Sequence, residues 1–181
     1  MSIAHSILTY TGRYISLTEP AEAEFHITDI AHALSQTCRF GGHTRQFYSV
    51  AQHSVLVSQM VPVEYRLQAL LHDAAGSYFG DMVQPLKGLS SMRPYRDYER
   101  VMRSRLFDAF GVTPSAESTE AIKRADLQML AAERRDLMAP DLSPWPILDG
   151  IFPRHASISP LMPVSAEALF LKRFKELAGV L

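Results

Sequence analysis

The sequence predicts an all-helical domain with a small β-hairpin in front of it. Apolar residues recur every three or four positions through most of the chain, which is the spacing of amphipathic helices. The early segment ILTYTGRYISL instead alternates apolar and polar residues around Thr11-Gly12, as two short strands joined by a tight turn do. We therefore expect one domain over 1–181, made of a hairpin at about 7–17, a helical core at about 28–139, a proline-rich strap at 140–164 and a C-terminal helix at 165–178.

Composition favours a soluble protein that binds a small molecule. The 181 residues are 47% apolar without a long apolar run, which is enough for one buried core. Lys and Arg number 18 against 19 Asp and Glu, so the near-neutral charge argues against duplex nucleic acid or an anionic membrane as partner. The single Cys38 cannot form an internal disulfide, and no secretory signal pattern opens the chain, so we expect a cytoplasmic location.

The first two predicted helices flank a glycine-containing loop. Thr28 with Asp29 can start a helix that runs to about Thr37, and the following RFGGHT has the glycines of an irregular loop. Ser49 followed three residues later by Gln52 has the form of a capping box, which would place a histidine in the first turns of the next helix.

Three further helices are predicted before the strap. Pro62 suits the first turn of a helix whose apolar stripe ends near Gly76. Helical spacing recurs over 94–110, where the outer face is rich in arginine, and over 113–138. Six of the 11 prolines then lie between 140 and 163, too many for a helix or a central strand.

Acidic residues on these apolar stripes predict a bound cation. His72 and Asp73 fall in the last turn of one predicted helix, and Asp126 lies on the apolar side of another. Burying a carboxylate is costly unless it is paired or bound to a metal. Together with His53 they supply two imidazoles and two carboxylates, which suit a divalent ion (Mn, Co, Zn, Fe or Mg) with positions open for water and substrate.

These four residues also carry a resemblance to a known family, the HD-domain phosphohydrolases. The matching residues are His53 in VAQHSVLV, His72-Asp73 in LLHDAAG and Asp126 in IKRADLQML. The motifs CRFGGH and GDMVQPLK most resemble the small 5′-deoxynucleotidases and the phage-type dATP triphosphohydrolases, and the likeness covers about residues 8 to 139. It implies the helical HD fold, a metal held by the four residues, and hydrolysis of a phosphate ester or anhydride.

The resemblance also implies roles for residues around the metal. Arg39 would grip a phosphate, Phe40 would pack against the sugar or base, and His43 of the same loop would contact the substrate. Lys87 would bind phosphate and assist catalysis, and Asp81 would act near the sugar or the water at the metal. The alternatives are a surface arginine beside a core aromatic residue, a solvated lysine, and an aspartate that only shapes a Gly-Asp turn.

Gly76 departs from the family pattern. The family usually has a glutamate four residues after the paired histidine, where it assists proton transfer. Its loss would remove a general acid–base contribution of about 10²- to 10⁴-fold unless Asp81, His43 or a water chain replaces it. The chain could therefore be a metal- and nucleotide-binding regulatory module with little turnover.

On this basis the expected function is hydrolysis of a small deoxynucleotide, with dATP as the first candidate. Lys87 favours a triphosphate over a monophosphate substrate. A cyclic-nucleotide or signalling-nucleotide hydrolase is the third possibility. A homo-oligomer is also expected, with the arginine-rich helix at 94–110 or the strap as the contact.

Overall fold

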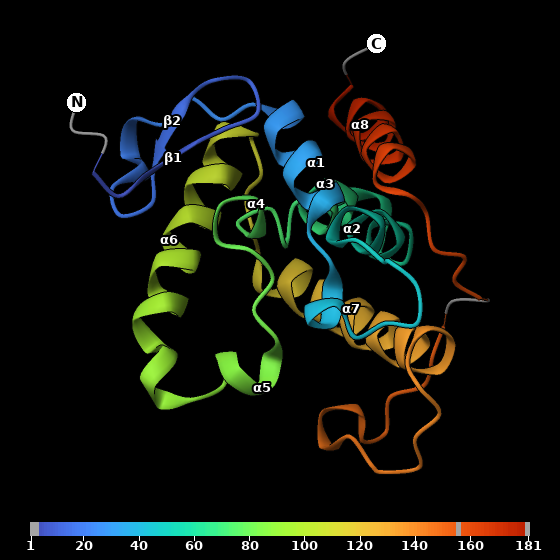
Figure 1. Ribbon diagram of the computed structural model, residues 1–181. Coiled ribbons are helices and arrows are strands. Elements are labelled where there is room, and N and C mark those ends of the chain that lie inside the picture. The colour runs from blue at the N-terminus through green and yellow to red at the C-terminus, as the bar shows by residue number, and fades with distance from the viewer. Residues whose placement is uncertain (1–3, 155–156, 180–181) are drawn as a thin grey trace.

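The computed structural model describes residues 4–154 and 157–179, and it confirms a mostly helical fold with one small hairpin (Figure 1). The strands are β1 (Ser6–Leu8) and β2 (Tyr14–Ser16). The α-helices are α1 (Ile27–Gln36), α2 (Val50–Gln59), α3 (Arg66–Leu70), α4 (Gly76–Phe79), α5 (Gln84–Lys87), α6 (Arg93–Ala109), α7 (Ala116–Leu137) and α8 (Pro163–Ala178). Short 3₁₀ turns occur at Pro20–Glu22, Arg39–Gly42, Val63–Tyr65, Ser90–Met92 and Pro146–Leu148.

The hairpin is anchored to α1 by a buried carboxylate. Strands β1 and β2 pair antiparallel with Ile7 opposite Ile15, and Gly12 takes a positive φ of 84° in the connecting turn. Asp29 of α1 accepts hydrogen bonds from the backbone N–H of Thr11 at 2.6 Å and from its hydroxyl at 2.8 Å. The predicted turn at Thr11-Gly12 is therefore present, and its polar groups fix the hairpin against the helical core.

Helix α2 is the central element of the domain. It contacts α1, α3, α7 and α8, and it buries side chains around most of its circumference (Figure 1). A helix surrounded in this way offers no polar face to solvent, so any polar side chain on it must find a partner inside the protein. His53 lies on this helix and is fully buried.

The predicted helix over Pro62 to Gly76 is wrong in its second half. Helix α3 ends at Leu70, residues 71–75 form an irregular turn, and Gly76 begins α4 instead of ending a helix. The His72 side chain bonds through Nδ1 to the carbonyl of Ala69 at 2.7 Å, one turn back along the chain. Adjacent residues on a helix point about 100° apart, so leaving the helix lets His72 and Asp73 face the same point.

Helices α6 and α7 are the two long helices of the fold. Gly111, with a φ of 68°, follows the end of α6, and Ser115 with Ser118 forms a capping box at the start of α7. One side of α7 buries Ile122, Ala125, Met129 and Ala132. Among the described residues, no helix is both long and apolar enough to cross a membrane.

The strap between α7 and α8 is irregular, as predicted, and it is tied to α2 by one amide. Gln52 Nε2 donates to the carbonyl of Ser159 at 2.8 Å, and Leu161 N donates to Gln52 Oε1 at 2.9 Å. The predicted capping box at Ser49 is therefore only half formed: its hydroxyl accepts from Gln52 N, but the Gln52 side chain reaches the strap instead. Helix α8 begins at Pro163, two residues earlier than predicted, because proline suits the first helical turn.

We predict that Gln52→Ala loosens the strap. It removes both hydrogen bonds and leaves two backbone groups unpaired, which costs about 1–3 kcal/mol of unfolding free energy. Urea unfolding measures the loss, and limited proteolysis within residues 139–162 measures the loosening. Gln59→Ala, an exposed glutamine on the same helix, is the control; equal effects of the two variants would contradict the anchoring role of Gln52.

Candidate metal centre

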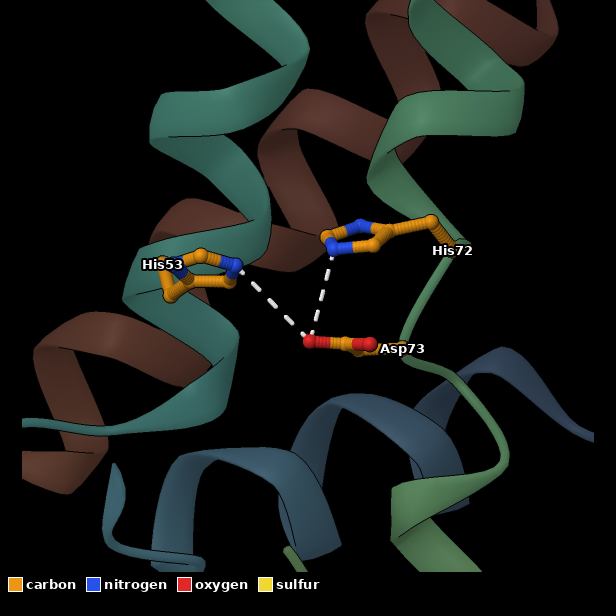
Figure 2. A group of neighbouring side chains, drawn as sticks. All are labelled: His53, His72 and Asp73. Carbon is orange, nitrogen blue, oxygen red and sulfur yellow. Dashed lines mark ion pairs between the residues drawn. The ribbon is translucent and has the colours of Figure 1, made fainter. Parts of the chain in front are cut away.

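Three side chains from two parts of the chain converge on one point inside the domain. His53 comes from α2, and His72 and Asp73 come from the turn after α3 (Figure 2). Asp73 Oδ2 lies 3.7 Å from His53 Nε2 and 3.4 Å from His72 Nε2. One ligand atom from each residue lies within 4.8 Å of the others, so this group could hold a metal ion.

Both histidines are oriented by their second ring nitrogen. His72 Nδ1 donates to the carbonyl of Ala69 at 2.7 Å, and His53 Nδ1 donates to Glu133 Oε1 at 2.6 Å. Each Nδ1 therefore carries a proton, and each Nε2 faces Asp73, where a neutral ring would offer its lone pair to an ion. Both Nε2 atoms are buried, and within residues 4–154 and 157–179 neither makes a well-directed hydrogen bond, although Asp126 Oδ1 lies 3.2 Å from that of His53. Metal-binding histidines show this arrangement, in which one nitrogen is held by a carboxylate or carbonyl and the other faces the ion.

Asp126 of α7 lies at the open edge of the cluster. Its Oδ1 is 3.2 Å from His53 Nε2, and its side chain is 39% exposed. Asp126 therefore contacts His53, but the group whose ligand atoms all lie within 4.8 Å of one another consists of His53, His72 and Asp73.

Glu133 is a part of the site that sequence reasoning missed. Its side chain is fully buried, and it bonds His53 with one carboxylate oxygen and the Arg39 guanidinium with the other, at 2.9 Å. Glu133 stands seven residues after Asp126, which is two helical turns, so both project from the same face of α7. That spacing is visible in the sequence and could have identified it.

Arg39 lies at the cluster, held by acidic groups. Its guanidinium bonds Glu133 and lies 3.7 Å from Asp73 Oδ2. Its Nε is buried, and no hydrogen-bond partner for it lies among the described residues. One N–H of the guanidinium is thus not used by this part of the protein.

The pKa shifts show that the carboxylates remain ionised. Burial tends to raise the pKa of Asp73, but the nearby His72 and His53 lower it by more. Burial also tends to raise the pKa of Glu133, and Arg39 with His53 lowers it by more. Both carboxyls therefore titrate below their ordinary range. Burial and Arg39 lower the pKa of His53, whereas Glu133 and Asp126 raise it to about 9. Three carboxylates thus face the Arg39 guanidinium and a protonated His53, and a divalent cation that replaces the His53 Nε2 proton would balance the charge of the cluster.

Asp81 lies close enough to the cluster for its charged groups to shift the pKa of the Asp81 carboxyl. Burial raises the pKa of its carboxyl, with Asp73 adding to the shift and Arg39 opposing it. A carboxyl with a raised pKa can hold a proton nearer neutral pH, which is the property of a general acid.

Lys87 of α5 forms an ion pair with a residue of the next helix. Its ammonium contacts the Glu99 carboxylate of α6 at 2.6 Å. The ammonium predicted to bind phosphate is thus already ion-paired in this structure.

Phe40 is placed beside the cluster by a strained backbone. Its φ of 55° is in the left-handed region, which costs a non-glycine residue about 1–2 kcal/mol. Its ring lies 6.4 Å from that of Trp145 in the strap, and the Arg39 guanidinium lies 5.4 Å from its centre. His43, at the end of the same loop, is exposed.

The fold and the cluster together define a mostly helical domain with a His-Asp group that could hold a metal ion. No family model matches the chain. It is 40% identical over 173 residues to the uncharacterised protein YfdR of Escherichia coli strain K12, covering 95% of each chain. It is also 34% identical over 127 residues to an uncharacterised protein of Rhodobacter capsulatus, covering 64% of each chain. The chain belongs to the YfdR family.

We predict that Glu133→Gln destabilises the protein strongly. The change keeps the shape of the side chain but removes the buried carboxylate that bonds Arg39 most closely and leaves only the more distant Asp73 at 3.7 Å, which costs about 3–5 kcal/mol. Chemical unfolding at pH 7 measures the loss. Glu120→Gln, an exposed glutamate on the same helix, should stay within about 0.5 kcal/mol of the wild type.

The same variant should change the pH dependence of stability. Because the pKa of Glu133 lies below its ordinary value of 4.5, its contribution is complete above that pH and is lost as pH falls through the lowered pKa. The wild type should therefore lose stability more steeply than Glu133→Gln on acidification below about pH 5. If the unfolding free energy of the two proteins falls equally with pH, Glu133 is not ionised in the folded state.

Proposed function

We propose that this protein is a divalent-metal-dependent phosphohydrolase that acts on small nucleotides. The observation that carries the proposal is the pair of buried Nε2 atoms of His53 and His72, both facing the Asp73 carboxylate (Figure 2). Two ring nitrogens and a carboxylate oxygen this close together need a cation between them. Without a metal, a proton on His53 Nε2 fills that role, as its raised pKa indicates, and a metal ion that displaces the proton would gain both nitrogens and the carboxylate oxygen as ligands.

The donor set fits a borderline first-row metal ion. Two imidazole nitrogens favour Mn, Fe, Co or Zn over Mg, which prefers oxygen ligands. When bound, such an ion polarises a phosphoryl oxygen and makes water a better nucleophile at neutral pH. The partial exposure of Asp126 leaves the cluster open to substrate on one side.

The surrounding residues supply the rest of a phosphate site. The free Nε–H of Arg39 can donate to a phosphoryl oxygen and stabilise the charge that develops there. Asp81, with its raised pKa, can hold the proton that the leaving oxygen needs. The rings of Phe40 and Trp145 lie beyond Arg39 and offer aromatic surface to a nucleoside.

The resemblance to HD-domain phosphohydrolases supports the same reaction and adds the substrate class. The order of one histidine, a His-Asp pair and a distant aspartate is the mark of that family, and deoxynucleotides, dATP first, follow from the branch that the chain most resembles.

A second candidate function is motivated by Gly76. At the position of the family's glutamate this chain has no side chain, so it could bind metal and nucleotide with little turnover. Gly76 begins α4 with a backbone that other residues tolerate, and an added Cβ would lie 3.6 Å from Leu34 Cδ2, an ordinary contact. A Cβ is therefore accommodated at this position, which allows glutamate to be tried there.

We predict metal-dependent phosphate release from a deoxynucleotide. Purified protein is assayed with Mn, Co, Zn or Mg against dAMP and dATP, with total phosphate and tripolyphosphate measured. Asp73→Asn removes the carboxylate that both histidines face and should abolish release and metal binding together. Asp149→Asn, an exposed aspartate, should change neither; release that survives in Asp73→Asn would rule out this centre as the active site.

We predict that Gly76→Glu tells an efficient enzyme from an impaired one. If the natural chain lacks an essential acid–base group, the glutamate should raise turnover by about tenfold or more at unchanged metal content. Gly76→Gln has the same shape without a titratable group and should give no gain. No gain from Gly76→Glu in a chain that already turns over would mean that Asp81 or another group supplies the proton.

A further inference from the structure

A cavity of about 450 Å³ opens directly from the candidate metal centre. It lies between α6 and α7, and His72, Asp73 and Asp126 form one end of its lining. Any molecule that reaches the metal through this cavity must therefore pass between these two helices.

Most of the charged residues in the rest of the cavity lining are basic, and they lie among polar and apolar residues such as Gln68, Phe107 and Ile122. Arg100 and Arg103 lie three residues apart on one face of α6, and Lys123 lies three residues before Asp126 on α7. Within residues 4–154 and 157–179, neither Arg103 nor Lys123 has an ion-pair partner. Arg100 shares its charge with Asp97 at 2.9 Å.

One acidic residue lines the cavity away from the metal ligands. Asp108 lies 4.0 Å from the guanidinium of Arg105, so its charge is partly balanced. The cavity outside the metal ligands thus carries an excess of positive charge, with two unpaired cations facing a solvent-accessible space.

We infer that this cavity binds the distal phosphates of a polyphosphorylated nucleotide, with Arg103, Lys123 and Arg100 as their cationic partners. The inference rests on the proposed function and names its substrate class as nucleoside triphosphates. The phosphorus that reacts lies at the metal, and the remaining phosphates extend between α6 and α7.

The chemistry of the cavity walls favours phosphate over other ligands. Arginine forms paired hydrogen bonds to phosphate oxygens, and a half-buried, unpaired guanidinium gains more from an anion than an exposed one does. A monophosphate bound at the metal would leave Arg103 and Lys123 without partners.

The sequence attributed a preference for triphosphates to Lys87, whereas the structure offers the cavity residues for this role. Lys87 is held by Glu99 and does not line the cavity, whereas Arg103 lines it and is free. Selectivity for a triphosphate would thus come from α6 and α7.

The direct test compares two inorganic anions that contain no nucleoside. Tripolyphosphate and orthophosphate are titrated calorimetrically into the full-length protein, with and without a fixed excess of Mg²⁺. The wild type should bind tripolyphosphate at least about tenfold more tightly than orthophosphate. Arg103→Gln should weaken tripolyphosphate binding about tenfold and orthophosphate binding less than about twofold, because only the distal groups reach α6.

Matched variants keep the test independent of folding. Arg93→Gln changes an 82% exposed arginine at the start of the same helix and should have no effect on either anion. Lys123→Gln changes the other unpaired cation and should reproduce the Arg103→Gln result, and near-UV circular dichroism checks that each variant is folded.

The outcomes separate this inference from the proposed function. Equal weakening of both anions, or no change in either, in folded Arg103→Gln and Lys123→Gln would overturn the cavity as a distal phosphate site, even if dAMP is hydrolysed. Selective loss of tripolyphosphate binding, in a protein that releases neither phosphate nor tripolyphosphate from dATP, would support the cavity and contradict the hydrolase.

Discussion

The carboxylate of Glu133, buried between the His53 imidazole and the Arg39 guanidinium, is the interaction on which the site depends. It holds a proton on His53 Nδ1 and so directs Nε2 toward Asp73. It also ties the loop that begins at Arg39 to α7, two helical turns from Asp126. A buried ion pair of this kind contributes little net stability, so we ascribe its presence to the orientation of the site.

The fold brings the remaining groups to this ion pair by specific backbone features. Burial of α2 on most sides removes water from around His53, and the turn at 71–75 aims His72 and Asp73 at one point. Negative charge is concentrated at the metal ligands, and positive charge lines the adjoining cavity through Arg103 and Lys123. A cation at the metal ligands and an anion in the adjoining cavity would complement this distribution of charge.

The sequence predicted the features that depend on local pattern and missed those that depend on tertiary contacts. Local patterns predicted the longer helices α1, α2, α6, α7 and α8 but not the four-residue helices α4 and α5. Acidic residues on apolar stripes pointed to Asp73, which lies in the cluster, and to Asp126, which contacts His53. The end of α3 was missed because the apolar spacing continues through Ala74, whereas a side-chain bond from His72 to Ala69 accompanies the end of the helix. Glu133 was visible by its spacing from Asp126, but nothing local indicated that its partners lie about 80 and 94 residues earlier. The pairing of Lys87 with Glu99 is likewise a packing outcome that no periodicity encodes.

The most direct test of the central claim is anomalous X-ray scattering from crystals grown with Mn²⁺ or Zn²⁺. We predict one strong peak about 2.0–2.3 Å from His53 Nε2, His72 Nε2 and an Asp73 carboxylate oxygen. The peak should be absent from crystals of Asp73→Asn. A wild-type map with no peak at these three atoms, or with the metal bound elsewhere, would contradict the assignment of this cluster as the metal centre.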